Sequence, residues 1–495
     1  MERSSGILLP VFSLPSPGGI GTFGKDAYDF VDFLNAAGQR YWQLLPLGPT
    51  SYGDSPYQSF SAYAGNPYFI DPGLLMEEGL LTKEEFLLYA CEDSDAVDYA
   101  AIYETRFKLL RRAAERGLKK DTAAFARFQM ANESWLKDYA LFMALKRHFQ
   151  MNAWTQWEDD DIRLRKKAAM EHYRELLSHE IEIIAYEQYK FFEQYGSLRD
   201  YAHQKGIKIL GDLPIYVAMD SADVWANPEN FLLDESLCPV AVAGVPPDPF
   251  SKTGQLWGNP LYRWEDMKKD GYAWWKARIR GANMLYDAIR IDHFRGFASY
   301  WSVDAKESTA VNGKWINGPG AAFIHALSDA AHGMEIIAED LGYLDERVYE
   351  LLKLSGFPGM KVLEFAFDSR EPGNYLPHTY PENCVCYLGT HDNAPILAWL
   401  DDVAPQDLEF AKEYLGLNTE EGFSLGLLRG GMGSVAALFV AQMQDWLNLG
   451  AQSRINTPGT LGGNWKWRMK KGVLTDALAQ KIRRMSYIYG RADNP

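Results

Sequence analysis

Cysteine is scarce in this chain of 495 residues, which holds only Cys91, Cys238, Cys384 and Cys386. So few thiols do not form a disulfide framework in a chain of this length, and they favour a reducing compartment. The first residues, MERSSGILLP, lack the apolar stretch of a secretory signal, and no run approaches the roughly 18 apolar residues that cross a bilayer. The sequence therefore predicts a cytoplasmic protein that does not associate with membranes.

Positive charge is also in short supply, because 50 Lys and Arg face 66 Asp and Glu, which gives a net charge of −16. Nucleic acids and anionic membranes are bound by clustered basic side chains, so neither is expected as a partner. Aromatic residues, by contrast, make up 14% of the chain, with 15 Trp and 28 Tyr. Most of them are expected in the core, but their flat apolar faces and polar edges also suit a neutral ligand.

The expected elements alternate between strands and helices along most of the chain. Residues 1–73 begin this α/β pattern and 187–495 continue it, whereas 74–186 carry long charged helices and are predicted to be a helical insertion. Residues 218–264 are rich in Pro, Gly, Asn and Trp and are predicted to be a second, loop-rich insertion. Further strands are expected at 288–292, 335–339 and 385–388. The pattern favours a (β/α)₈ TIM barrel with these two insertions and no separate C-terminal β-domain.

Acidic residues stand where four of the expected strands end. The runs are IKILGD, AIRID, EIIAED and CVCYLGTHD, which bring Asp212, Asp292, Glu339 or Asp340, and Asp392. The C-terminal ends of barrel strands ring one mouth, so acids that are distant in sequence converge there. A carboxylate-based active site is therefore predicted at this mouth.

The alternation of side chains along a strand sorts these residues by face. Arg290 and Asp292 share one face of their strand, and in a barrel this polar pair points inward. The same parity puts Glu339 and Asp340 on opposite faces, so one of them faces the lumen, and the pattern does not say which. A structural ion pair is the alternative interpretation of Arg290 and Asp292 when that motif is taken alone.

Convergent carboxylates suit the cleavage of glycosidic bonds. One ionised carboxylate attacks the anomeric carbon while a second, protonated carboxyl donates to the leaving oxygen, and a separation of about 5 to 5.5 Å marks the retaining mechanism. The positive charge of Arg290 would keep Asp292 ionised, and the crowding of further acids would raise the pKa of the proton donor.

Aromatic residues are interleaved with polar ones in three loop segments. YGDSPYQSFSAYAGNPY carries Tyr52, Tyr57, Tyr63 and Tyr68 among small polar side chains, GQLWGNP carries Trp257 and Asn259, and GNWKWR carries Asn464 and Trp465. A sugar offers hydroxyls and an apolar C–H face, so these segments are candidates for sugar-binding surfaces.

Two formal motif matches do not carry function. GGIGTFG fits the dinucleotide fingerprint, but Pro15 and Pro17 precede it and no acid follows at the required distance. Cys384 and Cys386 lack a second ligand pair for zinc, and alternation across a strand explains their spacing. We expect neither a cofactor nor a metal.

Long segments in the same order as in a known family extend over nearly the whole chain. DAIRIDHFRGF, EIIAEDLG and YLGTHDN resemble the three catalytic segments of the 4-α-glucanotransferases called amylomaltase or disproportionating enzyme, family 77 of the glycoside hydrolases and relatives of the α-amylases. RSSGILLP, GGIGTFG, GDLPIYV, AGVPPDPFSKTGQLWGNPLY, GFPGMKVLEFAF and RINTPGTLGGNWKWR extend the resemblance.

The resemblance implies roles for particular residues. Asp292 would be the nucleophile, Glu339 the general acid/base in preference to Asp340, and Asp392 the group that holds the distorted sugar. Arg290, His293 and His391 would line the donor subsite, and further substrate contacts would come from Tyr57, Ser55, Asp212, Trp257, Asn259 and Asn464. Of these, Asp212 is expected to play a supporting part.

The implied activity is the transfer of α-1,4-glucan segments, from a donor to the 4-hydroxyl of an acceptor glucan or glucose, by retaining double displacement. An α-1,4-glucan hydrolase of the α-amylase clan is the alternative within the enzymes, and a catalytically inactive glucan-binding protein is one from another class. Maltooligosaccharides and α-1,4-glucans are the expected partners, and a monomer or weak homodimer is the expected state.

Two positions depart from the family pattern. Pro249 stands where the family usually has Tyr after AGVPPD, and Ala394-Pro395 stand where it usually has Asp-Thr after GTHDN. The first removes an aromatic hydroxyl from the implied acceptor wall. The second disfavours helical backbone at Ala394, so changed loop geometry is expected without loss of catalysis.

Overall fold

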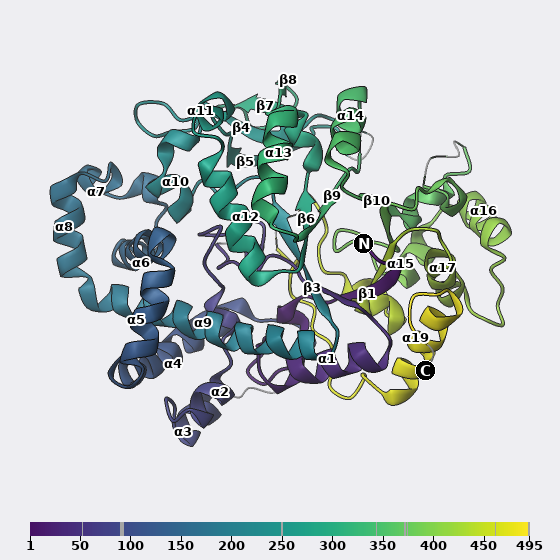
Figure 1. Cartoon of the computed structure of the whole chain (residues 1–495), viewed down its shortest axis with the longest axis horizontal. Helices are drawn as coiled ribbons and strands as arrows, with labels where there is room; N and C mark the ends of the chain where they lie inside the picture. The colour runs from purple at the N-terminus through teal and green to yellow at the C-terminus, as the bar shows by residue number, and fades with distance from the viewer. Residues whose placement is uncertain are drawn as a thin grey trace.

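Eight parallel strands form the centre of the molecule, which a computed structural model describes apart from residues 52, 90–93, 249–250, 343, 371–372, 374, 461 and 494–495. Figure 1 shows helices arranged around these strands. The order in the sheet is β10-β11-β12-β1-β2-β3-β6-β9. The strands are β1 (Ser4–Leu8), β2 (Tyr41–Gln43), β3 (Lys208–Pro214), β6 (Ala288–Asp292), β9 (Glu335–Ala338), β10 (Gly359–Val362), β11 (Cys384–Tyr387) and β12 (Leu438–Gln442).

The first and last strands of this order meet at a seam that nearly closes the barrel. The backbone N–H of Ala338 after β9 donates to the carbonyl of Pro358 before β10 at 2.9 Å. The Asp340 carboxylate accepts from the N–H of Met360 at 2.6 Å, so a side chain supplies the next link across the seam. The predicted (β/α)₈ barrel is confirmed.

Strand β6 has the bounds that alternation predicts, with Ile289 and Ile291 fully buried. Strand β9 ends one residue earlier than expected, and β11 lies one residue earlier at both ends. Strands β10 and β12 were not predicted. All five residues of β12 are buried, so its sequence, LFVAQ, has no polar face to give an alternating pattern.

Helices cover the outside of the barrel, and a group of them between β2 and β3 extends to the left of Figure 1. That group comprises α2 (Pro72–Glu77), α3 (Lys83–Tyr89), α4 (Tyr99–Lys120), α5 (Thr122–Ala131), α6 (Glu133–His148), α7 (Asp160–Arg163), α8 (Lys167–Leu176) and α9 (Ser178–Gln204). The boundary predicted between 186 and 187 falls within α9. That residues 74–186 form a subdomain stays a prediction.

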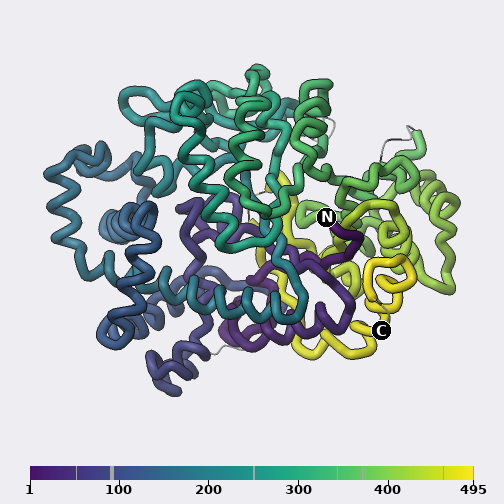
Figure 2. Tube along the Cα trace, in the orientation of Figure 1, coloured from purple at the N-terminus to yellow at the C-terminus, as the bar shows by residue number. Residues whose placement is uncertain are grey.

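The remaining helices follow the other strands and bring the chain ends together. They are α1 (Lys25–Ala36), α10 (Ala222–Ala226), α11 (Trp264–Lys269), α12 (Ala273–Leu285), α13 (Gly320–Ala331), α14 (Glu346–Ser355), α15 (Ile396–Asp402), α16 (Pro405–Leu415), α17 (Phe423–Met432), α18 (Met443–Trp446) and α19 (Asp476–Ile488). Because α19 packs against α1 and β12 pairs with β1, the last part of the chain lies beside the first, as the tube in Figure 2 shows. In the described part of the chain, no helix combines the length and apolarity that a membrane span requires.

A second, antiparallel sheet lies above the barrel in Figure 1. Its order is β5-β4-β7-β8, with β4 (Ala241–Val245), β5 (Gln255–Pro260), β7 (Ser299–Asp304) and β8 (Gly313–Asn317). Segment 218–264, predicted to be loop-rich, therefore contains two strands as well as α10. Strand β4 pairs with β7, which lies outside that segment, so the pattern of 218–264 alone does not reveal the sheet.

Candidate active site

The predicted acids do gather at the mouth of the barrel. Asp212 lies within β3, Asp292 ends β6, and Glu339 directly follows β9. Strand β3 pairs with β6, which in turn pairs with β9, so these three residues come from consecutive strands of the barrel. Asp392 lies in the loop after β11.

Arg290 lies at the centre of a buried charge network. Its Nη1 donates to Oδ1 and Oδ2 of Asp212 at 2.9 and 2.8 Å, and its Nη2 donates to Oδ1 of Asp292 at 2.8 Å. Burial by itself would lower the pKa of the guanidinium, but Asp212 and Asp292 together raise it well above its ordinary value. Arg290 is therefore a fixed positive charge shared between two carboxylates.

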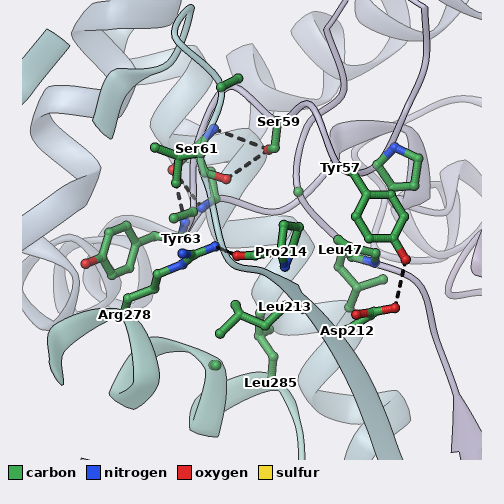
Figure 3. A pocket seen from close by; sticks show the side chains of 18 of the residues that line it. Leu47, Tyr57, Ser59, Ser61, Tyr63, Asp212, Leu213, Pro214, Arg278 and Leu285 are labelled. Carbon is green, nitrogen blue, oxygen red and sulfur yellow. Dashed lines mark hydrogen bonds between the residues drawn. The ribbon is translucent and has the colours of Figure 1, made fainter. Parts of the chain in front are cut away.

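Tyr57 binds Oδ2 of Asp212, an oxygen that Arg290 also contacts. Its hydroxyl donates to Oδ2 at 2.7 Å, which Figure 3 shows as a dashed line. Burial and Asp212 raise the pKa of this hydroxyl well above its ordinary value, so it stays protonated and can donate. The Tyr57 ring stacks on His391 with centroids 5.2 Å apart and also contacts Trp465. These three rings form an aromatic wall beside Asp212.

The register between β6 and β9 selects Glu339 over Asp340. Arg290 pairs with Ile337, so Ile337 and Glu339 lie on the face that carries Arg290 and Asp292. Asp340 lies on the other face and binds the N–H of Met360 at the seam. Strand pairing therefore shows which of the two acids shares the face of Arg290 and Asp292, whereas the role of Glu339 as the general acid/base stays a prediction.

Glu339 accepts two backbone hydrogen bonds, from His293 N at 2.7 Å to Oε2 and from Leu341 N at 2.9 Å to Oε1. Burial nevertheless raises the pKa of Glu339 to about 7, and the nearby Asp292 charge adds to the rise against the opposing effect of Arg290. A carboxyl with this pKa is protonated in about half of the molecules near neutral pH and can act as an acid or a base.

His293 turns the chain directly after Asp292. Its backbone is left-handed, with φ of 57°, and this turn directs the His293 N–H to Glu339. Its ring lies edge-to-face with Trp257 at 4.8 Å between centroids. Burial lowers the pKa of His293 to about 4, so its ring is neutral at physiological pH.

Asp392 is held by a distant part of the chain. Asn456 Nδ2 donates to Asp392 Oδ1 at 2.6 Å, and Arg454 Nη2 donates to the Asp392 carbonyl at 2.6 Å. His391 Nε2 lies 3.3 Å from the same Oδ1. The side chain of Asp392 is 43% exposed. Asn456 fixes its carboxylate and Arg454 fixes its backbone carbonyl, so Asp392 is accessible yet held in position.

Three other residues that were predicted to contact substrate, Ser55, Asn259 and Asn464, form hydrogen bonds within the protein. Ser55 Oγ accepts from the N–H of Tyr57 at 3.3 Å. Asn259 donates to the Val217 carbonyl at 2.8 Å and accepts from Gln58 at 3.4 Å.

The side-chain amide of Asn464 forms hydrogen bonds within the loop that carries it. Its Oδ1 accepts from Thr457 N at 3.0 Å, and its Nδ2 donates to the Thr460 carbonyl at 3.2 Å. Ser55 and Asn259 thus position the segment that bears Tyr57, whereas Asn464 shapes the loop beside Trp465. Whether any of the three touches substrate stays a prediction.

Reasoning from patterns did not single out Asn456, Arg454 or Met360. Met360 lies under the network, with its Sδ 3.3 Å from Arg290 Nε. Asn456 and Arg454 belong to RINTPG, whose only signal was its place in the family resemblance. Their role depends on a contact with a residue more than sixty positions earlier, which no local pattern reveals.

Some predicted features lie outside the described residues, namely Tyr52, Cys91 and Pro249. The other departure from the family pattern is described, and α15 begins just after it, at Ile396. Ala394 lies outside any helix, as the following proline favours.

The fold and the acids at its mouth together indicate a class of protein. Asp292 and Glu339 follow directly paired residues of neighbouring strands, which lie about 4.8 Å apart in a sheet. That spacing fits the short separation of carboxyl groups in retaining glycosidic chemistry. The chain is a (β/α)₈ barrel with neighbouring carboxylates at its mouth, the arrangement found in barrel enzymes that act through paired carboxylates.

Known proteins narrow this class to one family. The sequence model of the family described as 4-alpha-glucanotransferase matches residues 9–475. The 4-alpha-glucanotransferase of Clostridium butyricum is 50% identical over 486 residues, 98% of this chain and 100% of the relative. That of Streptococcus pneumoniae serotype 4 is 47% identical over 493 residues, 99% of this chain and 98% of the relative.

A solved structure agrees with these sequence relatives. The amylomaltase of Streptococcus agalactiae, in complex with acarbose, superposes with a TM-score of 0.97 at 42% identity, and the match covers 99% of this chain and 100% of that one. The chain therefore belongs to the 4-α-glucanotransferase family, and the family predicted from the sequence is confirmed.

Proposed function

We propose that this enzyme moves α-1,4-glucan segments between sugar chains by double displacement at Asp292 and Glu339. The observation that carries the proposal is the contrast between these two neighbouring acids. Arg290 holds Asp292 as an ion pair, whereas burial raises the pKa of Glu339 to about 7. One acid is thus suited to attack as a carboxylate and the other to donate a proton.

In the first step, an Asp292 carboxylate oxygen forms a bond to the anomeric carbon of the donor glucan. The bond from that carbon to the glycosidic oxygen breaks, and the oxygen takes the Glu339 proton. The product is a glucosyl ester on Asp292, and Glu339 is left as a carboxylate. Arg290 Nη2, which donates to Asp292 Oδ1 at 2.8 Å, fixes the position of the attacking group.

In the second step, Glu339 takes the proton from the 4-hydroxyl of an acceptor sugar. The acceptor oxygen then attacks the anomeric carbon and displaces Asp292, which restores the α-linkage because the configuration is inverted twice. Water in place of the acceptor would give hydrolysis, the alternative activity. The family relatives favour transfer, since their shared name is that of a transferase.

The rest of the mouth is suited to hold a neutral sugar. Asp392, fixed by Asn456, offers carboxylate oxygens to ring hydroxyls. The neutral His293 ring beside Trp257 and the stacked pair of Tyr57 and His391 offer flat faces with polar edges. The acarbose complex of the Streptococcus agalactiae amylomaltase supports a glucan-like ligand here. The cytoplasmic location and the monomeric or weakly dimeric state stay predictions from the sequence.

Incubation with maltotriose tests the proposal directly. Transfer yields glucose together with a ladder of longer maltooligosaccharides, whereas hydrolysis yields shorter products only, and the latter outcome would refute the transferase assignment. Asp292→Asn and Glu339→Gln should abolish the ladder. Asp340→Asn is the matched control, because it changes the adjacent acid on the opposite face of the strand and should leave the ladder in place.

A further inference from the structure

The carboxyl group of Glu364 is buried beside the loop that joins β11 to α15, and it takes no part in the double displacement. We call residues 388–395, which form this connection, the Asp392 loop. Glu364 follows β10 in the short 3₁₀ helix Leu363–Phe367 and is only 8% exposed. Its N–H donates to the carbonyl of Leu388, the first residue of the loop, at 3.2 Å.

Glycine at position 389 lets the carboxyl approach the backbone of the Asp392 loop. A Cβ at Gly389 would lie 2.7 Å from Glu364 Oε1 and 3.1 Å from Glu364 Cδ, which is too close for a side chain to occupy. Gly389 does not belong to the described glycines with positive φ, so its backbone could carry a side chain. The close contact with Glu364 is therefore what requires glycine here.

Asn393 connects this carboxyl to the backbone of Asp392. The side-chain amide of Asn393 donates to the Glu364 carboxyl. On its other side, Asn393 Oδ1 accepts from the N–H and from the hydroxyl of Thr390 at 2.9 and 2.8 Å. The Thr390 hydroxyl oxygen in turn accepts from the N–H of Asp392 at 3.3 Å. A series of hydrogen bonds thus leads from Glu364 to the residue that is proposed to hold the sugar.

The stability of the fold does not explain a glutamate at position 364. Burial and the charge of Asp445 raise the pKa of the Glu364 carboxyl well above its ordinary value, so the group is protonated at neutral pH. Its Oε1 has no hydrogen-bond partner within the described part of the chain. A buried polar atom without a partner destabilises a folded protein. The contribution of this carboxyl therefore lies in its contact with the Asp392 loop.

Other groups hold the Asp392 loop from other sides. An oxygen of Asp445, on α18, accepts from the N–H of Ile396 at 2.8 Å, where the loop ends and α15 begins. Asn456 binds the side chain of Asp392 itself. Glu364 adds a contact from the side of β10 and reaches the part of the loop between these two.

From the buried carboxyl, the glycine that admits it and the hydrogen bonds through Asn393, we infer that Glu364 is a positioning residue for Asp392. It acts through the Asp392 loop and does not touch substrate. This inference rests on the proposed function, which supplies the role of Asp392 in holding the sugar. Loss of the contact should displace Asp392, and small displacements in an active site lower turnover strongly.

Two variants remove the contact in different ways. Glu364→Leu keeps a side chain of similar size that cannot accept from Asn393, and Gly389→Ala pushes the Glu364 carboxyl away from the loop. Glu364→Gln is the conservative variant, because its amide oxygen still accepts. Glu187→Leu is the matched control, since Glu187 is also buried with one oxygen that lacks a described partner but lies on α9, among the inserted helices.

We expect Glu364→Leu and Gly389→Ala each to lower kcat for transfer from maltotriose by about 10-fold to 100-fold. The kcat of Glu364→Gln and that of Glu187→Leu should stay close to the native value when each is measured below its own thermal midpoint. Native kcat in a folded Glu364→Leu variant would overturn the inference. So would equal losses in Glu364→Gln and Glu364→Leu, which would show that the hydrogen bond from Asn393 does not matter.

The binding of acarbose, the ligand in the solved Streptococcus agalactiae relative, tests whether Glu364 acts through Asp392. Calorimetry on the native protein, Asp392→Asn, Glu364→Leu and the double variant gives the coupling between the two positions. Glu364→Leu should weaken binding in the native background and have little further effect once Asp392 is changed. Full additivity of the two changes would overturn the inference.

The same data separate this inference from the proposed function. If the native protein forms no ladder from maltotriose but the two changes weaken acarbose binding non-additively, the transferase proposal fails and the role of Glu364 stands. If the ladder forms while the effects of the two changes add fully, the role of Glu364 fails and the transferase proposal stands. A native protein that forms no ladder and binds no acarbose would refute both.

Discussion

Asp292 and Asp392 lie at the same barrel mouth but are held in place in different ways. The partner of Asp292 is Arg290, two residues earlier on the same strand, and its neighbour Glu339 follows the adjacent strand. Asp392 lies in a loop and is bound by Asn456, 64 residues further along the chain. The acids of the proposed chemistry are thus positioned by strand register, whereas Asp392, which is proposed to hold the sugar, is positioned by a remote segment.

The largest expected effect is at Asp292, which is positioned by strand register, because Asp292→Ala removes the proposed nucleophile. Transfer from maltotriose should fall by about 10⁴-fold or more, because the covalent step has no substitute group. Initial rates of glucose release measure the loss. Activity within tenfold of the native protein would show that the nucleophile lies elsewhere.

Glu339→Gln is expected to lower kcat/KM by about 10²-fold to 10⁴-fold, the usual contribution of a general acid or base. In the native protein, kcat/KM should fall as pH rises through about 7, because Glu339 must be protonated for the first step. This alkaline limb should vanish in the glutamine variant. It should persist in His293→Asn, since the pKa of His293, near 4, keeps that ring neutral over this range.

Arg290→Met is expected to reduce both stability and activity. The side chain of Arg290 is only 4% exposed and compensates two carboxylates, so its removal leaves buried charge unpaired at a cost of about 3 to 5 kcal/mol. Unfolding in urea measures the change. Asp340→Asn, also on the barrel wall, should cost much less because its amide oxygen can still accept from Met360.

The smallest expected effect is at Asn456, the remote residue that binds Asp392. Asn456→Ala removes one charge-assisted hydrogen bond to Asp392, which predicts a loss of about 10-fold to 100-fold in kcat/KM. Asn383→Ala is the matched control, because this exposed amide donates to the Gly356 carbonyl at 3.0 Å and is not among the predicted substrate contacts. Equal losses in both variants would mean that the effect of Asn456→Ala does not come from the bond to Asp392.

The same difference explains what the sequence could and could not predict. Alternation gave the bounds of β6 and the shared face of Arg290 and Asp292. Of the four acids expected at strand ends, Asp292 ends β6 and Glu339 directly follows β9, whereas Asp212 lies within β3 and Asp392 lies in the loop after β11. It left Glu339 and Asp340 undecided, because that choice depends on how β9 pairs with β6. The bond between Asp392 and Asn456 was beyond any local pattern, since the two residues meet only when the barrel is complete.

The fold was predictable to a similar extent and for similar reasons. Strands with polar residues on one face stood out, whereas β12, buried along its whole length, did not. The antiparallel sheet was missed because β4 needs β7 as its partner, and β7 follows the barrel strand β6. The family resemblance, which rests on long segments in the same order, predicted the roles of individual residues that local periodicity could not assign.

The left-handed backbone at His293 has a consequence for the reading of mutational data. Most side chains disfavour φ near 57°, and β-branched ones do so strongly, while Asn and Gly accept it. A β-branched substitution at this position therefore alters both the ring that meets Trp257 and the peptide N–H that binds Glu339, whereas Asn or Gly alters the ring alone. In a library of variants, valine at 293 would resemble a defect in proton transfer and glycine a defect in sugar binding, although both change the same residue.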